Sequence, residues 1–437
     1  MIWWQILIWI LLGLLFLMFL RVPVAFSFLT VNSIAAFYIW GEEKGLGLLI
    51  TSIESSLTNF SLLPIPLFIL MGELMFQSKM APKMIQTVDK WIGNIPGRLS
   101  ILAVGSGSLL STLTASSMAS TAMLGSTLVP EMKEKKYHNS MAMGPILGSG
   151  ALAALIPPSA IGVLLASLGQ ISVGHFMVSI IVPGILVAVF YFIYIVVRAK
   201  IQPRLAPEYK GEKVSFSEKI KHTIIYIFPL GFILFCVIGL TFLGVATPTE
   251  AAALGVVGSL ILSACYRTLT MKVLIKSLAE TMKVSVMILL IVSGSTAFSQ
   301  ILSFSGASRN LVTLVTSLDV SPLLIIIFML LIVLILGTFL ESLSIIMLVV
   351  PIFFPIVQIL GYDMFWFAVL ILLAIEVGTI SPPFGTGLFT LKGVVSEETT
   401  MVDIYKASIP FIFLLIGVIT FIMIFPETVF WLPSFME

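Results

Sequence analysis

The chain has 437 residues, of which 59% are hydrophobic and only 10% are charged, and its mean hydropathy is +1.15. Soluble domains carry roughly 25% charged residues, so this chain has too few charges to cover a surface that faces water. The composition therefore predicts a polytopic protein of the lipid bilayer, and the net charge of +2 gives no reason to expect a nucleic-acid partner.

A membrane-spanning helix needs about 20 consecutive apolar residues. Ordinary spans are predicted near residues 3–20, 22–40, 61–77, 173–197, 223–243, 247–265, 284–302 and 407–425. The first span is interpreted as a retained helix, because it lacks the basic start and the small-residue cleavage site of a signal peptide. Residues 46–60 are amphipathic and are expected at the membrane interface.

Two stretches, 99–131 and 321–360, are too long for one span, yet their centres hold little polar linker. The first contains "LLSTLTASSMASTAMLGS" and the second "LILGTFLESLSI". Two arms of about 14 residues would each rise only about 21 Å, which is short of the ~30 Å hydrocarbon core. Both stretches are therefore predicted to be re-entrant helical hairpins that turn back inside the membrane.

Two other apolar stretches are interrupted by paired prolines: Pro157 and Pro158 within 140–171, and Pro382 and Pro383 within 364–391. Proline has no N–H and displaces the carbonyl four residues earlier. The predicted free carbonyls are those of Ala153, Ala154, Gly378 and Thr379. A single proline is often only a kink, but a helix break at membrane depth persists where it faces a cavity or ligand. Two matching Pro-Pro pairs favour that functional reading.

The order of elements repeats along the chain. Each half contains three spans, a hairpin, a Pro-Pro-broken helix and a last span, so each half crosses the membrane an odd number of times and the second must be inverted. This predicts two inverted repeats, 1–200 and 223–437, joined by a cytoplasmic connector, 201–222. With the N-terminus outside, 21 of the 23 Lys and Arg residues fall on the inner side, as the positive-inside rule requires.

Free carbonyls and nearby hydroxyls would form an all-oxygen site of the kind that suits Na⁺. The predicted Na⁺ ligands are Ser116, Ser117, Ala153, Ala154, Gly337, Thr338, Glu341, Gly378, Thr379 and Gly385. Helix N–H groups exposed after each break could hold an anionic group of a substrate. The predicted substrate-binding residues are Ser116, Ser117, Ser159, Glu341, Ser342 and Thr386.

Each of these assignments has a structural alternative. Serines in membrane helices often bond only to their own helix. Glu341 lies at midplane depth, where a carboxylate is functional by default, and its alternative is a protonated packing residue. Glu376 is either a second polar ligand or a structural partner within the bundle.

Four segments carry a family resemblance: "TASSMASTAMLGSTLVPEM" at 114–132, "GPILGSGALAALIPPS" at 144–159, "ILGTFLESLSIIMLVVPIFFPI" at 335–356 and "GTISPPFGTGLF" at 378–389. In this order they resemble the large membrane subunit (DctM type) of tripartite ATP-independent periplasmic (TRAP) transporters. The resemblance runs over nearly the whole chain. It implies ion sites between each hairpin tip and the broken helix beside it.

The resemblance further implies an elevator-type symporter that uses a Na⁺ gradient to import small organic anions, carboxylates or sugar acids. It would act in the bacterial inner membrane with both termini in the periplasm. Its expected partners are a small four-helix membrane subunit (DctQ type) and a periplasmic solute-binding protein (DctP type). The alternatives are a self-sufficient Na⁺- or H⁺-coupled carrier, a channel and an intramembrane enzyme; no protease motif supports the last, so no enzymatic activity is expected.

Overall fold

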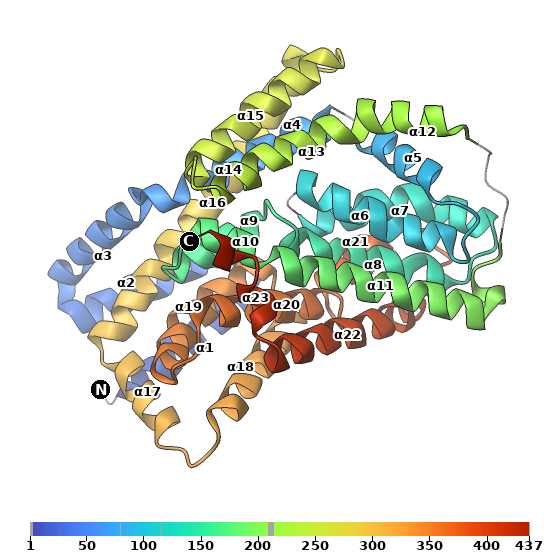
Figure 1. Ribbon diagram of the computed structural model, residues 1–437. Helices are drawn as coiled ribbons and strands as arrows, with labels where there is room; N and C mark the ends of the chain where they lie inside the picture. The colour runs from blue at the N-terminus through green and yellow to red at the C-terminus, as the bar shows by residue number, and fades with distance from the viewer. Residues whose placement is uncertain (1–2, 79, 115, 209–213, 437) are drawn as a thin grey trace.

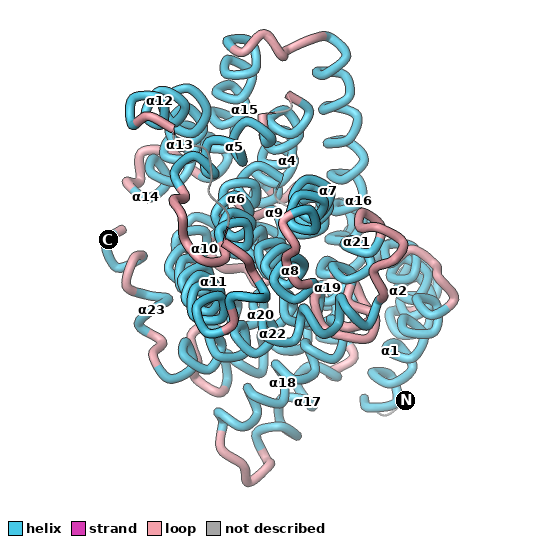
Figure 2. Tube along the Cα trace, turned by 90° about the vertical axis from the view of Figure 1, so that its right-hand side faces the viewer, coloured by secondary structure: helices cyan, strands magenta, loops and turns pink. Residues whose placement is uncertain are grey.

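The computed structural model describes residues 3–78, 80–114, 116–208 and 214–436. Within these ranges the chain consists of helices and connecting loops, with no strand (Figure 2). The helices of the first half are α1 Trp3–Phe19, α2 Val24–Trp40, α3 Glu42–Leu57, α4 Pro64–Gln77, α5 Ala81–Trp91, α6 Arg98–Thr114, α7 Ser117–Glu134, α8 Asn139–Leu155, α9 Ala160–Leu168, α10 Val173–Ser179 and α11 Ile181–Ile201. The predicted all-helical fold class is confirmed.

The described residues of the second half also form helices and connecting loops (Figure 1). Its helices are α12 Phe216–His222, α13 Phe228–Leu234, α14 Leu240–Phe242, α15 Pro248–Cys265, α16 Met271–Phe304, α17 Ala307–Thr316, α18 Pro322–Gly337, α19 Ser342–Ile359, α20 Met364–Thr379, α21 Thr386–Lys392, α22 Met401–Ile424 and α23 Glu427–Phe430. Two π-helical segments, Thr223–Ile227 and Phe235–Gly239, join α12 to α14. The division of the chain at 201–222 stays a prediction, and residues 209–213 of that connector lie outside the described ranges.

Seven helical stretches in the described ranges are long and apolar enough to cross a membrane, or eight when α8 and α9, bent by 46°, are one span. The protein is therefore a multi-pass membrane protein. One predicted span differs clearly from its helix, because α16 begins at Met271 whereas the apolar stretch begins near 284. Lys272, Lys276 and Lys283 lie on this extra length, and a helix can continue into water when its charges are solvated.

Two amphipathic helices were missing from the sequence prediction. Helix α5 lies between α4 and the first hairpin, and α17 lies between α16 and the second. Both are too short to span the membrane, so a search for long apolar runs passes over them. Side-chain contacts fix α5 to the end of the connector and the start of the second half: Lys90 Nζ donates to Glu218 Oε1 at 2.7 Å and Trp91 Nε1 donates to Thr223 Oγ1 at 2.6 Å.

Two helical hairpins and two Pro-Pro breaks are present, as the fold class requires. Helices α6 and α7 form the first hairpin, and α18 and α19 form the second. The first Pro-Pro pair separates α8 from α9, and the second separates α20 from α21. Ser159 restarts the chain as a helix after the first break, because its Oγ accepts a hydrogen bond from the N–H of Gly162 at 3.1 Å.

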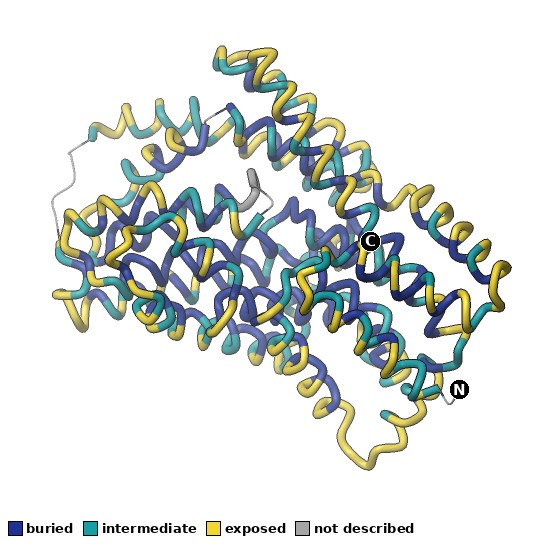
Figure 3. The backbone as a smooth tube through the Cα atoms, turned by 180° about the vertical axis from the view of Figure 1, so that it is seen from behind, coloured by how far each residue is buried: buried dark blue, intermediate teal, exposed yellow. Residues whose placement is uncertain are grey.

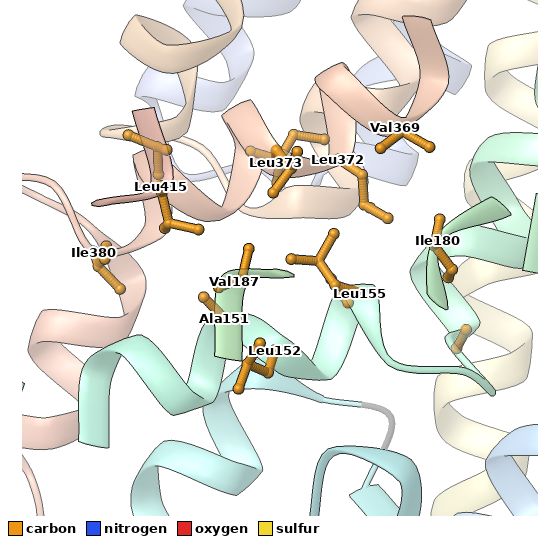
Figure 4. Packing of buried hydrophobic residues seen from close by; sticks show 14 of the residues in the cluster. Ala151, Leu152, Leu155, Ile180, Val187, Val369, Leu372, Leu373, Ile380 and Leu415 are labelled. Carbon is orange, nitrogen blue, oxygen red and sulfur yellow. The ribbon is translucent and has the colours of Figure 1, made fainter. Parts of the chain in front are cut away.

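The longer arms of the two broken helices form the centre of the molecule. Every residue of α8 from Met141 to Leu155 is buried, and so is every residue of α20 from Trp366 to Thr379. A helix that is apolar on all sides is stable where protein surrounds it completely. Figure 3 shows the buried centre with exposed helices around it, and Figure 4 shows Ala151 and Leu155 of α8 beside Leu372 and Leu373 of α20.

A second group of buried side chains joins α1 and α2 to α16 and α19, and includes Leu14, Phe28, Phe298 and Met347. Two buried hydrogen bonds cross this interface. Asn32 Nδ2 donates to the carbonyl of Gly294 at 2.7 Å, and Ser295 Oγ donates to the carbonyl of Met347 at 3.1 Å. Helix α16 is thereby held to both α2 and the second hairpin.

Candidate functional site

The tip of the first hairpin is positioned by two adjacent serines with different partners. Ser116 precedes α7, and its Oγ accepts a hydrogen bond from the N–H of Ala119 at 3.3 Å. Ser117 begins α7, and its Oγ lies 3.2 Å and 3.1 Å from the two carboxylate oxygens of Glu376. Ser116 therefore caps its own helix, whereas Ser117 reaches an element of the other half of the chain.

Glu376 is fully buried in α20, one turn before the second break. Besides Ser117, it contacts Thr379, whose Oγ1 donates to the Glu376 backbone carbonyl at 2.8 Å and lies 3.4 Å from Glu376 Oε2. Burying a carboxylate without such hydrogen bonds is very unfavourable. Of the two roles that the sequence left open, these contacts identify a structural partner that joins the first hairpin tip to the second broken helix.

The tip of the second hairpin packs directly against α20 through two glycines. A Cβ atom on Gly337 would lie 2.8 Å from the Gly378 Cα, and a Cβ on Gly378 would lie 2.5 Å from the Gly337 Cα. Small residues at membrane interfaces allow this close approach of two backbones. Glu341, at the position before α19, makes no capping hydrogen bond to its own helix, so its carboxylate is available for other partners.

The breaks leave three backbone carbonyls without a hydrogen bond from any described residue: those of Ala153, Ala154 and Thr379. The prolines remove the N–H groups that would otherwise bond to them. Gly378 was also predicted to have a free carbonyl, and this is wrong. Its oxygen accepts the N–H of Ser381 at 3.0 Å, because the end of α20 tightens into a shorter turn.

Both hairpin tips and both breaks meet at one cavity of about 290 Å³. The first tip contributes Ser116 and Ser117, and the second contributes Glu341 and Ser342. The remaining walls come from the start of α9, from Thr379 and Thr386 at the second break, and from α4 and α16. This volume corresponds to roughly ten water molecules at about 30 Å³ each, enough for a small solute.

The structure brings together some of the predicted site residues and separates others. Six of them line the cavity: Ser116, Ser117, Glu341, Ser342, Thr379 and Thr386. The others lie in the surrounding structure and not on the cavity wall: Ala153, Ala154, Ser159, Gly337, Thr338, Gly378 and Gly385. Their roles as ion or substrate ligands stay predictions.

Helices α4 and α16 also line the cavity, which was not predicted from the sequence. Helix α4 places Gly72, Glu73 and Phe76 on the cavity wall, and α16 places Met287 and Ile288 there. Glu73 could have been found by the reasoning applied to Glu341, because it is a carboxylate within an apolar run. The apolar residues of α16 carry no such signal, since nothing in the sequence distinguishes a cavity-lining residue from one that faces lipid.

The fold is that of known membrane transporters. The crystal structure of the YdaH transporter of Alcanivorax borkumensis superposes with a TM-score of 0.65 at 14% identity, covering 92% of this chain and 96% of that one. MtrF of Neisseria gonorrhoeae gives a TM-score of 0.61 at 16% identity, with 89% and 85% covered. At these identities the likeness shows the fold alone.

The particular family follows from the sequence. The model of the tripartite ATP-independent periplasmic transporter, DctM component, matches residues 11–428, and the chain belongs to this family. It is thus a permease subunit and not an enzyme.

Three relatives show the range of this family. The C4-dicarboxylate TRAP transporter large permease protein DctM of Pseudomonas aeruginosa is 29% identical, with 91% of this chain and 92% of that protein covered. The ectoine TRAP transporter large permease protein TeaC of Halomonas elongata is 27% identical, with 95% and 96% covered. The sialic acid TRAP transporter large permease protein SiaM of Vibrio cholerae is 28% identical, with 97% of each covered.

Proposed function

We propose that this protein is the large permease subunit of a Na⁺-coupled secondary transporter that imports small organic anions, carboxylates or sugar acids, delivered by a periplasmic binding protein. The observation that carries the proposal is the single cavity lined by both hairpin tips and both helix breaks. Transporters with inverted repeats bind substrate and coupling ions at such discontinuous helices near the midplane. The relatives are named for C4-dicarboxylate, ectoine and sialic acid, so this family accepts chemically different solutes on one architecture.

The coupling ions would bind beside the cavity, one at each break. The first site would use the free carbonyls of Ala153 and Ala154 with the hydroxyls of Ser116 and Ser117. The second would use the carbonyl of Thr379 with the tip of the second hairpin, Gly337 to Glu341. Gly378 and Gly385 stay proposed members of the second set, since the Gly378 carbonyl oxygen accepts one hydrogen bond from Ser381 and keeps a second lone pair for a cation. Oxygen donors of this kind suit a hard cation.

Alternating access would occur by an elevator movement. The hairpins and broken helices pack around α8 and α20 and would move as one body. Helices α1 to α4 and α12 to α16 would form the fixed scaffold and hold the small membrane subunit. The match to the isethionate TRAP transporter permease protein DctMQ of Oleidesulfovibrio alaskensis covers only 57% of that protein. That relative thus contains additional sequence besides its large-permease region, which supports the proposal of a further membrane component.

The proposed location is the bacterial inner membrane, with both termini in the periplasm. In this orientation only Lys44 and Arg309 among the lysines and arginines lie outside. A periplasmic solute-binding protein would then deliver substrate to the face that carries the loops after α3, α9 and α14.

Na⁺ should stabilise the purified protein where K⁺ does not. Thermal unfolding would be measured in detergent while NaCl replaces KCl at constant ionic strength. A ligand that binds only the folded state adds about 2.7 kcal/mol of stability at a hundredfold excess over its Kd. The expected result is a saturable rise in Tm that is specific to Na⁺. Identical curves in the two salts would contradict Na⁺ sites in this subunit.

Glu341→Ala should reduce Na⁺-dependent uptake strongly without unfolding the protein. The carboxylate lines the cavity and makes no capping bond to α19, so its removal leaves the hairpin intact. The Na⁺-dependent Tm shift should shrink in parallel with uptake in proteoliposomes. Glu54→Gln, on the exposed face of α3, provides the control for a lost carboxylate elsewhere. Wild-type uptake by Glu341→Ala would remove Glu341 from the mechanism.

A further inference from the structure

The cavity between the hairpins is lined by acidic but not by basic side chains. Two of its lining residues are ionisable, Glu73 and Glu341, and both are acidic. The fully buried Glu376 is hydrogen-bonded to Ser117 and does not itself line the cavity. The ion pairs found in the described ranges involve none of the three, and no lysine, arginine or histidine lines the cavity. A ligand that enters this cavity therefore meets acidic side chains with no basic residue to offset them.

Glu73 differs from Glu341 in its position. It lies on α4, which runs unbroken from Pro64 to Gln77, whereas the proposed Na⁺ ligands all belong to hairpin tips and helix breaks. Gln77 Nε2 donates to one Glu73 oxygen, Oε2, at 3.1 Å. No described residue donates to Oε1. In the proposed function Glu341 binds a coupling ion. Glu73 also lines the cavity, but no ligand has been assigned to its carboxylate.

We propose that the substrate is a zwitterionic organic acid, and that Glu73 binds its cationic nitrogen, an ammonium or amidinium group. This inference rests on the proposed function and narrows its substrate class to carboxylates that also carry a cationic nitrogen. An N⁺–H group and a carboxylate form a short, charge-assisted hydrogen bond that is stronger than a neutral one. The acid group of the substrate would be held by hydroxyls of the same cavity, those of Ser342 and Thr386.

A dianion of similar size fits this cavity poorly. Its second carboxylate would replace the cationic nitrogen and face Glu73, and like charges a few ångströms apart repel strongly where water is scarce. The same cavity with a neutral residue at position 73 would lose this discrimination. Glu73 is therefore a specificity-determining residue, separate from the residues proposed to bind Na⁺.

A matched pair of ligands tests the proposal directly. 4-Aminobutyrate and succinate have similar length, and they differ by an ammonium group in place of one carboxylate. The Tm of the purified protein would be measured in saturating NaCl as each ligand is added. The 4-aminobutyrate concentration that gives half of the maximal rise in Tm should be roughly tenfold lower than that of succinate, a ratio that corresponds to about 1.4 kcal/mol. Glu73→Gln should abolish this preference, and Glu54→Gln should retain it. Tighter binding of succinate by the wild-type protein would overturn the proposal.

A second measurement does not depend on the ligand chosen. Met287 lines the cavity from α16 and is partly exposed, so Met287→Cys provides a reporter thiol in a Cys236→Ala/Cys265→Ala background. Both native cysteines lie in a separate apolar groove along α13 and α15. A cationic methanethiosulfonate should react roughly tenfold faster than an anionic one, because the carboxylates raise the local concentration of cations. Glu73→Gln should reduce that ratio.

The Tm titration and the labelling rates together test whether Glu73 binds a cationic group. If neither ligand changes the Tm, a cationic preference that depends on Glu73 supports the proposal, and equal labelling by the two reagents refutes it. The Na⁺-dependent Tm shift should persist in Glu73→Gln, which shows that the variant is folded and that its ion sites are intact. Loss of Na⁺ stabilisation in the wild-type protein would instead contradict the proposed function, so the two failures are distinguishable.

Discussion

Gly378→Ala should destabilise the protein by about 3 kcal/mol and abolish uptake, because the added methyl group would overlap the backbone of the second hairpin. The new Cβ would lie 2.5 Å from the Cα and 2.7 Å from the carbonyl carbon of Gly337. These are backbone atoms, so no rotamer change can relieve the overlap. Either the second hairpin moves away from α20 or α20 bends, and either change displaces the tip that carries Glu341 from the cavity.

The matched control is Gly417→Ala in α22. Gly417 also lies within a long apolar helix, but a Cβ at this position would meet no atom within 4 Å. Thermal unfolding in detergent and uptake in proteoliposomes should show Gly417→Ala close to the wild type, since alanine is the better helix former. If Gly378→Ala unfolded and transported like Gly417→Ala, the close packing of the second hairpin on α20 would be wrong.

Ser117→Ala and Glu376→Gln should each reduce stability and uptake, and their effects should not add. Removing the serine hydroxyl leaves a buried carboxyl group with one hydrogen-bond donor fewer, at a cost of about 1–3 kcal/mol. Because the two residues are in direct contact, a double-mutant cycle should give an interaction energy of roughly 0.5–3 kcal/mol. The measured quantities are the unfolding free energy of the four proteins and the initial rate of Na⁺-dependent uptake.

Ser126→Ala supplies the comparison on the same helix. Ser126 is exposed on α7, and its Oγ donates to the carbonyl of Met123 and to no other residue that the structure describes. Paired with Glu376→Gln, it should show additive effects within measurement error. Additivity in the Ser117 cycle as well would indicate that the first hairpin tip and α20 are energetically independent, in conflict with the hydrogen bonds between them.

Both predictions concern contacts made by α20. This helix receives the tip of the second hairpin at Gly378 and the tip of the first hairpin at Glu376, two residues apart. Ion binding at one hairpin tip would consequently change the position of the other, because both tips contact the buried part of α20, Trp366 to Thr379. Such an arrangement would couple the proposed ion sites at the two breaks to each other and to the cavity.

The sequence predicted the hairpins and the breaks well, because their signals are local. Paired prolines remove specific hydrogen bonds wherever they occur, and an apolar stretch too long for one span yet without a polar linker has few alternatives in a membrane. The short helices α5 and α17 were missed, since an amphipathic segment of ten or eleven residues resembles a loop when only long apolar runs are sought.

The roles of the acidic residues at the site could not be predicted from the sequence either. Glu341, Glu376 and Glu73 all lie in apolar runs and all carry the same local signal. The tertiary structure gives them different positions: one at a hairpin tip, one fully buried against Ser117, and one on the cavity wall from α4. The Gly378 carbonyl is a second example. The proline removes its usual hydrogen-bond donor, but the turn that follows α20 supplies another, the N–H of Ser381.

By itself the sequence determined the membrane class, the two hairpins, the two broken helices and the family to which the chain belongs. These follow from composition and from backbone chemistry that acts over a few residues. Only the tertiary structure decided that both tips and both breaks share one cavity, that α4 and α16 complete its walls, and that Glu376 joins the two halves. Contacts between residues 259 positions apart, such as Ser117 and Glu376, depend on how whole helices pack, and no local pattern encodes that packing.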